Sequence, residues 1–167
     1  MRGYGAAYAV LSGVRDAVSA ELVAHGGTLP ARVAIYPGTI AWDDCNQCGL
    51  LAVSSVRYFL SDKFPLEVAV TDYGPGSVFC ADMAVQVVRC APQPADGELS
   101  PPPAALERSA QQVNDDGYSI ICATRAYLQA LKDRLDIDDY MIRNLTFPGP
   151  EGACVGAELG FVVGFDQ

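Results

Sequence analysis

The hydrophobic positions near the start of this chain predict an amphipathic helix over residues 6–25. Apolar side chains recur there at three- and four-residue steps, which places them on one face of a helix. These side chains are Leu11, Val14, Val18 and Leu22. Two glycines follow at 26–27 and supply the backbone freedom that ends a helix. We expect this helix to pack on a sheet.

A longer helix is predicted over residues 103–135. Apolar and small residues alternate four- and three-residue steps along it, a heptad-like seam of the kind that is buried against a sheet or another helix. The seam consists of Leu106, Ala110, Val113, Gly117, Ile120, Thr124, Tyr127 and Leu131. A helix of this length would be about 50 Å long. The segment 114–117 is the place where it would be interrupted.

Strand patterns occupy much of the remaining chain. Short β-rich runs are predicted at 32–36, 50–60 and 82–90, and the region from 154 to 165 alternates without a break. One face of this last strand is apolar, and the other consists mostly of glycine and other small residues. Glycines weaken a strand that stands alone, so we expect a partner close to its backbone, either a helix of the same chain or a neighbouring subunit. The candidate self-assembly strand comprises Val155, Gly156, Ala157, Leu159, Gly160 and Phe161.

The 167 residues fit a single domain, 1–167. The fold class expected is α/β in the broad sense (α+β), with a small mixed and mainly antiparallel sheet packed against the N-terminal helix and the long helix. Two segments lie outside these elements. Residues 61–80 form an extended loop or a projecting hairpin, and residues 91–103, with five prolines, form a stiff and exposed connection.

The net charge of the chain argues against some classes of function. The chain carries 20 acidic residues against 11 basic ones, a net charge of −9. A protein with this balance does not hold nucleic acid by neutralising its phosphates, although it could surround DNA without gripping it. No run of about 18 apolar residues occurs, so we expect no membrane span, and the N-terminus lacks the pattern of a signal peptide.

The six cysteines leave three interpretations open. Cys45 and Cys48 have the two-residue gap of a metal-binding or redox pair, but a structural zinc site normally has a second close pair, and none follows. A small cysteine-based redox enzyme and a zinc-stabilised binding module therefore remain as alternatives. The ordinary interpretation is that the thiols pack as small hydrophobic groups, as expected for Cys122.

No catalytic constellation is recognised. His25 is the one histidine, and at the end of a helix a cation is favourable without any catalytic role. Asp43 and Asp44 are adjacent and so point opposite ways in an extended chain, which favours turn chemistry over paired carboxylates. The run 136–139 lacks the glycine and distal glutamate of a calcium loop. We expect a protein that is not an enzyme and that uses no cofactor or metal.

Several segments together carry a resemblance to a known family. They are YPGTIAWDDC at 36–45, CGL at 48–50, VVRCAP at 87–92 and GACVGAEL at 152–159. The set resembles neck proteins of tailed phages that infect actinobacteria, the head-to-tail connector or tail terminator proteins. The similarity spans about residues 30–163.

The resemblance implies a structural virion protein. A tail terminator is a small α/β subunit whose copies form a hexameric ring on the finished tail tube. Its expected partners are further copies of itself, the major tail tube protein, the head-tail stopper or adaptor, and genomic DNA passing through the lumen without sequence-specific binding. The place implied is the virion neck, after assembly in the host cytoplasm. The alternative within the same class is the head-to-tail stopper or adaptor itself.

The resemblance also implies a cluster of thiols or disulfides. Its members would be Cys45, Cys48, Cys90 and Cys154. The chain departs from the family pattern at Asn46-Gln47, where another cysteine is common, and this weakens a specific metal site.

Overall fold

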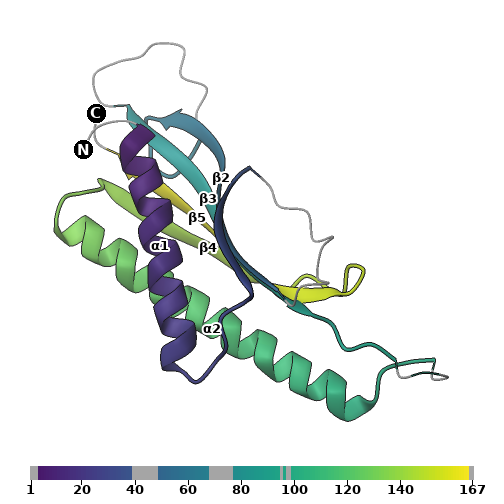
Figure 1. Cartoon of the computed structure of the whole chain (residues 1–167). Helices are drawn as coiled ribbons and strands as arrows, with labels where there is room; N and C mark the ends of the chain where they lie inside the picture. The colour runs from purple at the N-terminus through teal and green to yellow at the C-terminus, as the bar shows by residue number, and fades with distance from the viewer. Residues whose placement is uncertain (1–3, 39–48, 68–76, 95, 97–98, 166–167) are drawn as a thin grey trace.

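The computed structural model describes residues 4–38, 49–67, 77–94, 96 and 99–165. Two helices and five strands follow one another in the order α1 (Tyr4–Ala24), β1 (Arg32–Pro37), β2 (Leu50–Ser61), β3 (Val78–Cys90), α2 (Pro103–Asp133), β4 (Asp139–Thr146) and β5 (Cys154–Phe165). The strands form one sheet in the order β1-β2-β3-β5-β4 (Figure 1). The β1–β2 pair is parallel and the other three pairs are antiparallel. The expected α+β class, with its small mixed sheet and two helices, is confirmed.

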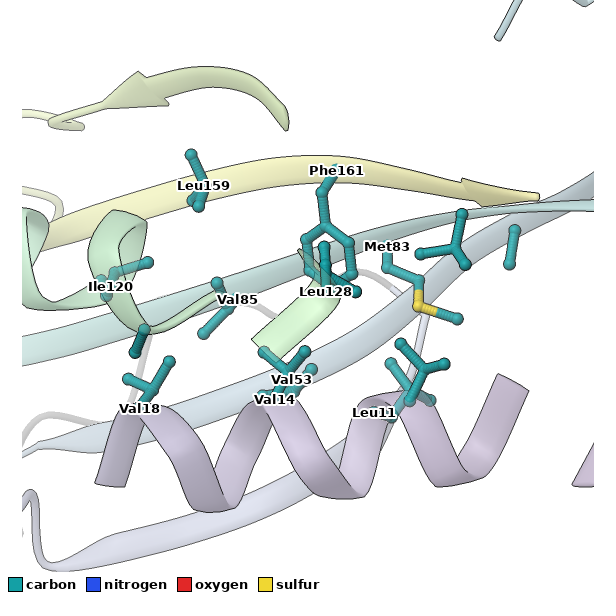
Figure 2. Close-up of a cluster of buried hydrophobic side chains, with 14 of the residues drawn as sticks. Leu11, Val14, Val18, Val53, Met83, Val85, Ile120, Leu128, Leu159 and Phe161 are labelled. Atoms are coloured by element: carbon teal, nitrogen blue, oxygen red, sulfur yellow. The ribbon is translucent and has the colours of Figure 1, made fainter. Parts of the chain in front are cut away.

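Both helices lie on the same face of the sheet (Figure 1). The apolar stripe predicted for the first helix is buried there, with Val14 and Val18 fully inaccessible. Figure 2 shows these two side chains pointing from α1 toward the strands that carry Val53 and Val85. The helix ends where expected, because Gly26 adopts a positive φ of 76° and the Gly27 amide donates to the Leu22 carbonyl oxygen at 2.9 Å.

The long helix is continuous. No interruption occurs at 114–117, because this segment is where α2 meets the sheet and its neighbours: Asp116 and Gly117 are both buried. Ile120 and Leu128 fill the space between α2 and the strands (Figure 2). After Asp133 the chain turns at Leu135, which has a φ of 60°.

The last strand alternates as predicted, but its position corrects the expected self-assembly role. β5 lies between β3 and β4, so both of its edges are already hydrogen-bonded. Its apolar residues, including Ala157, Leu159 and Phe161, are fully buried in the core shared with the two helices. Neither the edges of β5 nor its apolar face is therefore available for self-assembly, because the same chain covers them. A role of its small face in self-assembly stays a prediction.

Side chains of the same chain pack on the small face of β5 at two of its glycines. A Cβ atom added to Gly164 would lie 3.1 Å from the ring of Phe64. A Cβ added to Gly160 would lie 3.6 Å from the side-chain stem of Arg143. These glycines leave room for side chains that lean over the strand.

The structure describes parts of the two segments predicted as connections, 61–80 and 91–103. The strands β2 and β3 extend further than predicted, so that Ser61 and 78–80 belong to the sheet rather than to a loop. Residues 62–67 form a turn, and 68–76 lie outside the described residues. The proline-rich connection leads from the end of β3 to the first residue of α2, Pro103.

Candidate functional site

An apolar groove of about 620 Å³ lies at the end of the molecule where α2 begins. It is bounded by the first turns of α2, the proline-rich connection and the segment that joins β4 to β5. Its main lining residues are Pro92, Leu106, Val113, Phe147, Pro150 and Val155. We call it the end groove.

The end groove exists because the apolar seam of α2 runs past the part of the helix that its own sheet covers. Leu128 is fully buried and Val113 is 8% exposed, whereas Leu106 is 48% exposed. In Figure 1 the first turns of α2 lie beyond the region where the helix crosses the strands. The seam therefore stays apolar at turns that the described residues leave partly exposed.

One wall of the groove is set by a glycine in the helix. The Phe147 ring lies so close to Gly117 that a Cβ atom there would be 2.8 Å from the ring. Only glycine at this position lets the ring approach the α2 backbone. Phe147 remains 47% exposed on its other side and so presents an aromatic surface to the groove.

A buried ion pair fixes α2 on the sheet near this wall. The Nε and Nη2 atoms of Arg89, on β3, donate to the two carboxylate oxygens of Asp116, on α2, both at 2.8 Å. The side chains are only 7% and 5% exposed. A bidentate pair of this kind sets the direction of both groups, so it holds the helix in one position along its axis.

A second, polar hollow of about 310 Å³ lies between the end of α1 and α2. His25, Arg108, Asp116 and Ser119 are among its lining residues. His25 Nε2 is 2.9 Å from Glu21 Oε1 on the surface of α1, and Asp116 already uses both oxygens on Arg89. The histidine therefore lies on the surface of a helix end, as predicted.

The structure brings together two of the four cysteines in the expected cluster. Cys90 and Cys154 face each other across the β3–β5 pair. Cys154 is 1% exposed and is disulfide-bonded, though not to Cys90. Cys45 and Cys48 lie outside the described residues, as do Asp43 and Asp44. Among the described residues, no three His, Cys, Asp or Glu side chains are placed to hold a metal ion.

Cys80 and Cys122 are free thiols away from this pair. Burial of Cys80, and secondarily the negative charge of Asp138, raises the pKa of the Cys80 thiol to about 11. A thiol with this pKa is protonated near neutral pH and is a poor nucleophile. The Cys80 environment is that of a packed side chain.

The acidic run at 136–139 follows α2, and its last residue, Asp139, is the first residue of β4. Asp136 and Asp138 are exposed, as expected for a solvated helix exit. Asp139 begins the strand and accepts a hydrogen bond from Lys132 Nζ at 2.7 Å. The Lys132 ammonium, aided by the Tyr140 amide, lowers the pKa of the Asp139 carboxyl.

A turn at the opposite end of the sheet carries a second exposed apolar side chain. Residues 61–67, which we call the Leu66 turn, close on themselves because Ser61 Oγ donates to the Leu66 carbonyl oxygen at 2.5 Å. Glu67 pairs with Arg57, and Arg57 also bonds Asp82 at 3.2 Å. Asp82, then Glu67, raises the pKa of Arg57. Leu66 is 61% exposed on this anchored turn.

The sequence analysis missed two of these features, the end groove and the Arg89–Asp116 pair. The apolar seam of α2 is visible in the sequence from Leu106 onward, but nothing in the sequence shows that the first turns are left exposed. Arg89 ends a run of apolar strand residues, and a buried arginine requires an acidic partner. The sequence does not say which acid that is.

No protein-family model matches the chain, and no curated protein is significantly similar to it. None of the helices in the described part of the chain combines the length and the apolar character needed to cross a membrane.

Proposed function

We propose that this chain is a non-enzymatic structural subunit of a tailed-phage neck, the tail terminator, whose copies form a hexameric ring that caps the tail tube and joins it to the head. The motifs between residues 36 and 159 support the family, and the small α+β fold agrees with it. The stopper or adaptor of the neck is the alternative within the class.

The exposed apolar seam at the end groove is the observation that carries an assembly function. Leu106 and Phe147 each leave nearly half of their surface in water, at 48% and 47%, and they flank a hollow lined mainly by apolar side chains. Monomeric soluble proteins rarely keep contiguous apolar surfaces of this kind, which mark sites of protein contact. A closed ring would cover the groove in every copy.

The charge of the chain suits a ring around DNA. Each copy carries a net charge of −9, so a ring of copies is strongly negative. Tight DNA binding depends on cationic contacts to phosphates, and an acidic channel offers few of them. DNA would pass through such a ring without being held.

Electron microscopy of the purified full-length chain tests the proposal. Images are taken of the protein alone and after mixing with uncapped tail tubes. Rings that attach to one end of the tubes are expected. Monomers alone, with tubes left bare, would overturn the proposal. Rings that leave the tubes bare but bind the head's connector would assign the chain to the stopper or adaptor instead.

A further inference from the structure

We propose that Cys90 and Cys154 form a thiol–disulfide exchange site, in which the Cys90 thiolate attacks the disulfide-bonded sulfur of Cys154. This chemistry goes beyond the proposed function and does not depend on it. The register of β3 and β5, the hydrogen bonds where these strands meet and the exposure of the two residues support it.

The sheet places the two residues directly opposite each other. Cys90 is the last residue of β3, Cys154 is the first residue of β5, and the antiparallel register pairs them. Opposite residues of an antiparallel pair point their side chains to the same face of the sheet. Val88, which shares the Cys90 face of β3, lies in one buried cluster with Cys154. The Cys90 side chain therefore belongs to the face that carries the disulfide.

The backbone hydrogen bonds make this a close pair. The Ala91 amide donates to the Ala153 carbonyl oxygen at 2.7 Å, so the hydrogen-bonded pair is the next one along. The amide and carbonyl of Cys154 bond instead to the Glu151 backbone, at 3.0 and 3.1 Å. In a non-hydrogen-bonded pair the Cα atoms lie about 4.5 Å apart. A disulfide spans Cα atoms roughly 4.4–6.8 Å apart, so Cys90 and Cys154 can bond without a change of register.

Burial assigns different roles to the two sulfur atoms. Cys154 is 1% exposed and is disulfide-bonded to a cysteine other than Cys90. A thiol reagent in solution has little access to it. Cys90 is exposed, so water can stabilise the thiolate that an attack requires. The strand pairing holds this thiolate beside the buried disulfide, which makes Cys90 the attacking group.

The exchange is balanced without any other reactant. The Cys90 thiol gives its proton to water, and its thiolate attacks Cys154 Sγ. A Cys90–Cys154 sulfur–sulfur bond forms while the existing bond of Cys154 breaks. The former partner of Cys154 leaves as a thiolate and takes up a proton. One disulfide replaces another, so no external oxidant or reductant is consumed.

The other described cysteines lack this arrangement. Cys80 lies on the same face of β3, but it is fully buried and its partner in the register is Gly164. Cys122 lies on α2 and is not in a disulfide. Exchange is therefore expected at the Cys90 end of β3 and at neither of these thiols.

Disulfide mapping of the full-length parent chain tests the exchange. The purified protein is brought to pH 8 without oxidant or reductant, and samples are acidified at intervals, which protonates thiolates and stops the exchange. Mass spectrometry of peptides from a non-reducing digest then identifies the partner of Cys154. The Cys90–Cys154 link is expected to rise as the original link falls by an equal amount, or to be present from the start. A Cys154 that stays linked to one other cysteine throughout would overturn the proposal.

Two single variants assign the attacking group. Cys90→Ala should lose the exchange and keep the original link of Cys154 at all times. Cys122→Ala is the matched control, and it should exchange as the parent chain does. Circular dichroism checks that both variants are folded. If the original link of Cys154 is lost as fast in Cys90→Ala as in the parent chain, Cys90 is not the attacking group.

A double variant tests the geometry separately. The remaining cysteines of the sequence are Cys45 and Cys48, which lie outside the described residues. In Cys45→Ser/Cys48→Ser, a buffer of reduced and oxidised glutathione should produce Cys90–Cys154 as the predominant disulfide. Failure to form this pair would contradict the close approach of the two sulfur atoms and overturn the proposal. None of these outcomes decides whether the chain forms a ring.

Discussion

Arg89 and Asp116 show how a single pair of residues decides where α2 sits. Both side chains are buried and joined by two hydrogen bonds of 2.8 Å, so neither charge is left without a partner. The next residue, Gly117, admits the Phe147 ring that forms a wall of the end groove. The geometry of the proposed assembly surface therefore depends on a few neighbouring residues of the α2–sheet contact.

Removing one partner of this pair should be far more costly than removing both. Asp116→Ala leaves the arginine buried and unpaired and is expected to lower the free energy of unfolding by about 3–5 kcal/mol. The double variant Arg89→Met/Asp116→Leu should lose much less, because no uncompensated charge remains. Urea unfolding measures both.

The exposed pair between Arg134 and Asp136, at 2.9 Å, provides the control for this comparison. Asp136→Ala should change stability by less than about 1 kcal/mol, since exposed pairs contribute little. A loss as large as that of Asp116→Ala would contradict the role assigned to burial.

The buried Cys80 thiol should make stability fall at high pH. Its pKa in the folded chain is about 11, above the ordinary value of 9.0. The folded state thus favours the protonated thiol, and this contribution is fully present below about pH 9 and is lost as the pH rises toward 11. Urea unfolding between these pH values should show the decline, and Cys80→Ala should reduce it. An unchanged decline in Cys80→Ala would contradict this assignment.

At the scale of elements, α2 is one continuous helix with two environments. Its later turns are enclosed by α1 and the sheet, while its first turns border the end groove and the proline-rich connection. The heptad-like seam is the same in both parts. What differs is whether one of the described helices or strands packs against the seam.

The same substitution at two seam positions should reveal this difference. Leu128→Ala removes a fully buried side chain and is expected to cost about 2–5 kcal/mol. Leu106→Ala, at a side chain 48% exposed, should cost less than about 1 kcal/mol when the chain is monomeric. Thermal unfolding of dilute protein measures both. Equal costs would show that the first turns are covered within the monomer.

For the whole molecule, the negative net charge predicts that the chain does not bind duplex DNA. With a net charge of −9, the chain should not shift duplex DNA in a gel at about 50 mM salt, in monomeric or ring form. Fluorescence anisotropy with labelled duplex provides the second measurement. Salt-dependent binding in either assay would contradict an inert acidic channel and would require a basic surface.

The sequence by itself determined both helices, the last strand and the fold class, whereas β4 and the full lengths of β2 and β3 were not predicted. Both helices begin and end within a few residues of their predicted bounds, and β5 occupies the predicted span from 154 to 165. These features follow from hydrophobic periodicity, which is local. The sequence also showed that β5 has a small face, but it could not show that this strand lies inside the sheet.

Only the tertiary structure decided which apolar surfaces are covered. The position of β5 between β3 and β4 excludes it as an edge for self-assembly, and the length of α2 relative to the sheet leaves Leu106 exposed. It also paired Arg89 with Asp116, placed Cys90 opposite Cys154, and set the Leu66 turn and the end groove at opposite ends of the molecule. The physical reason is that periodicity assigns a residue to a face, whereas burial depends on which distant segment packs against that face.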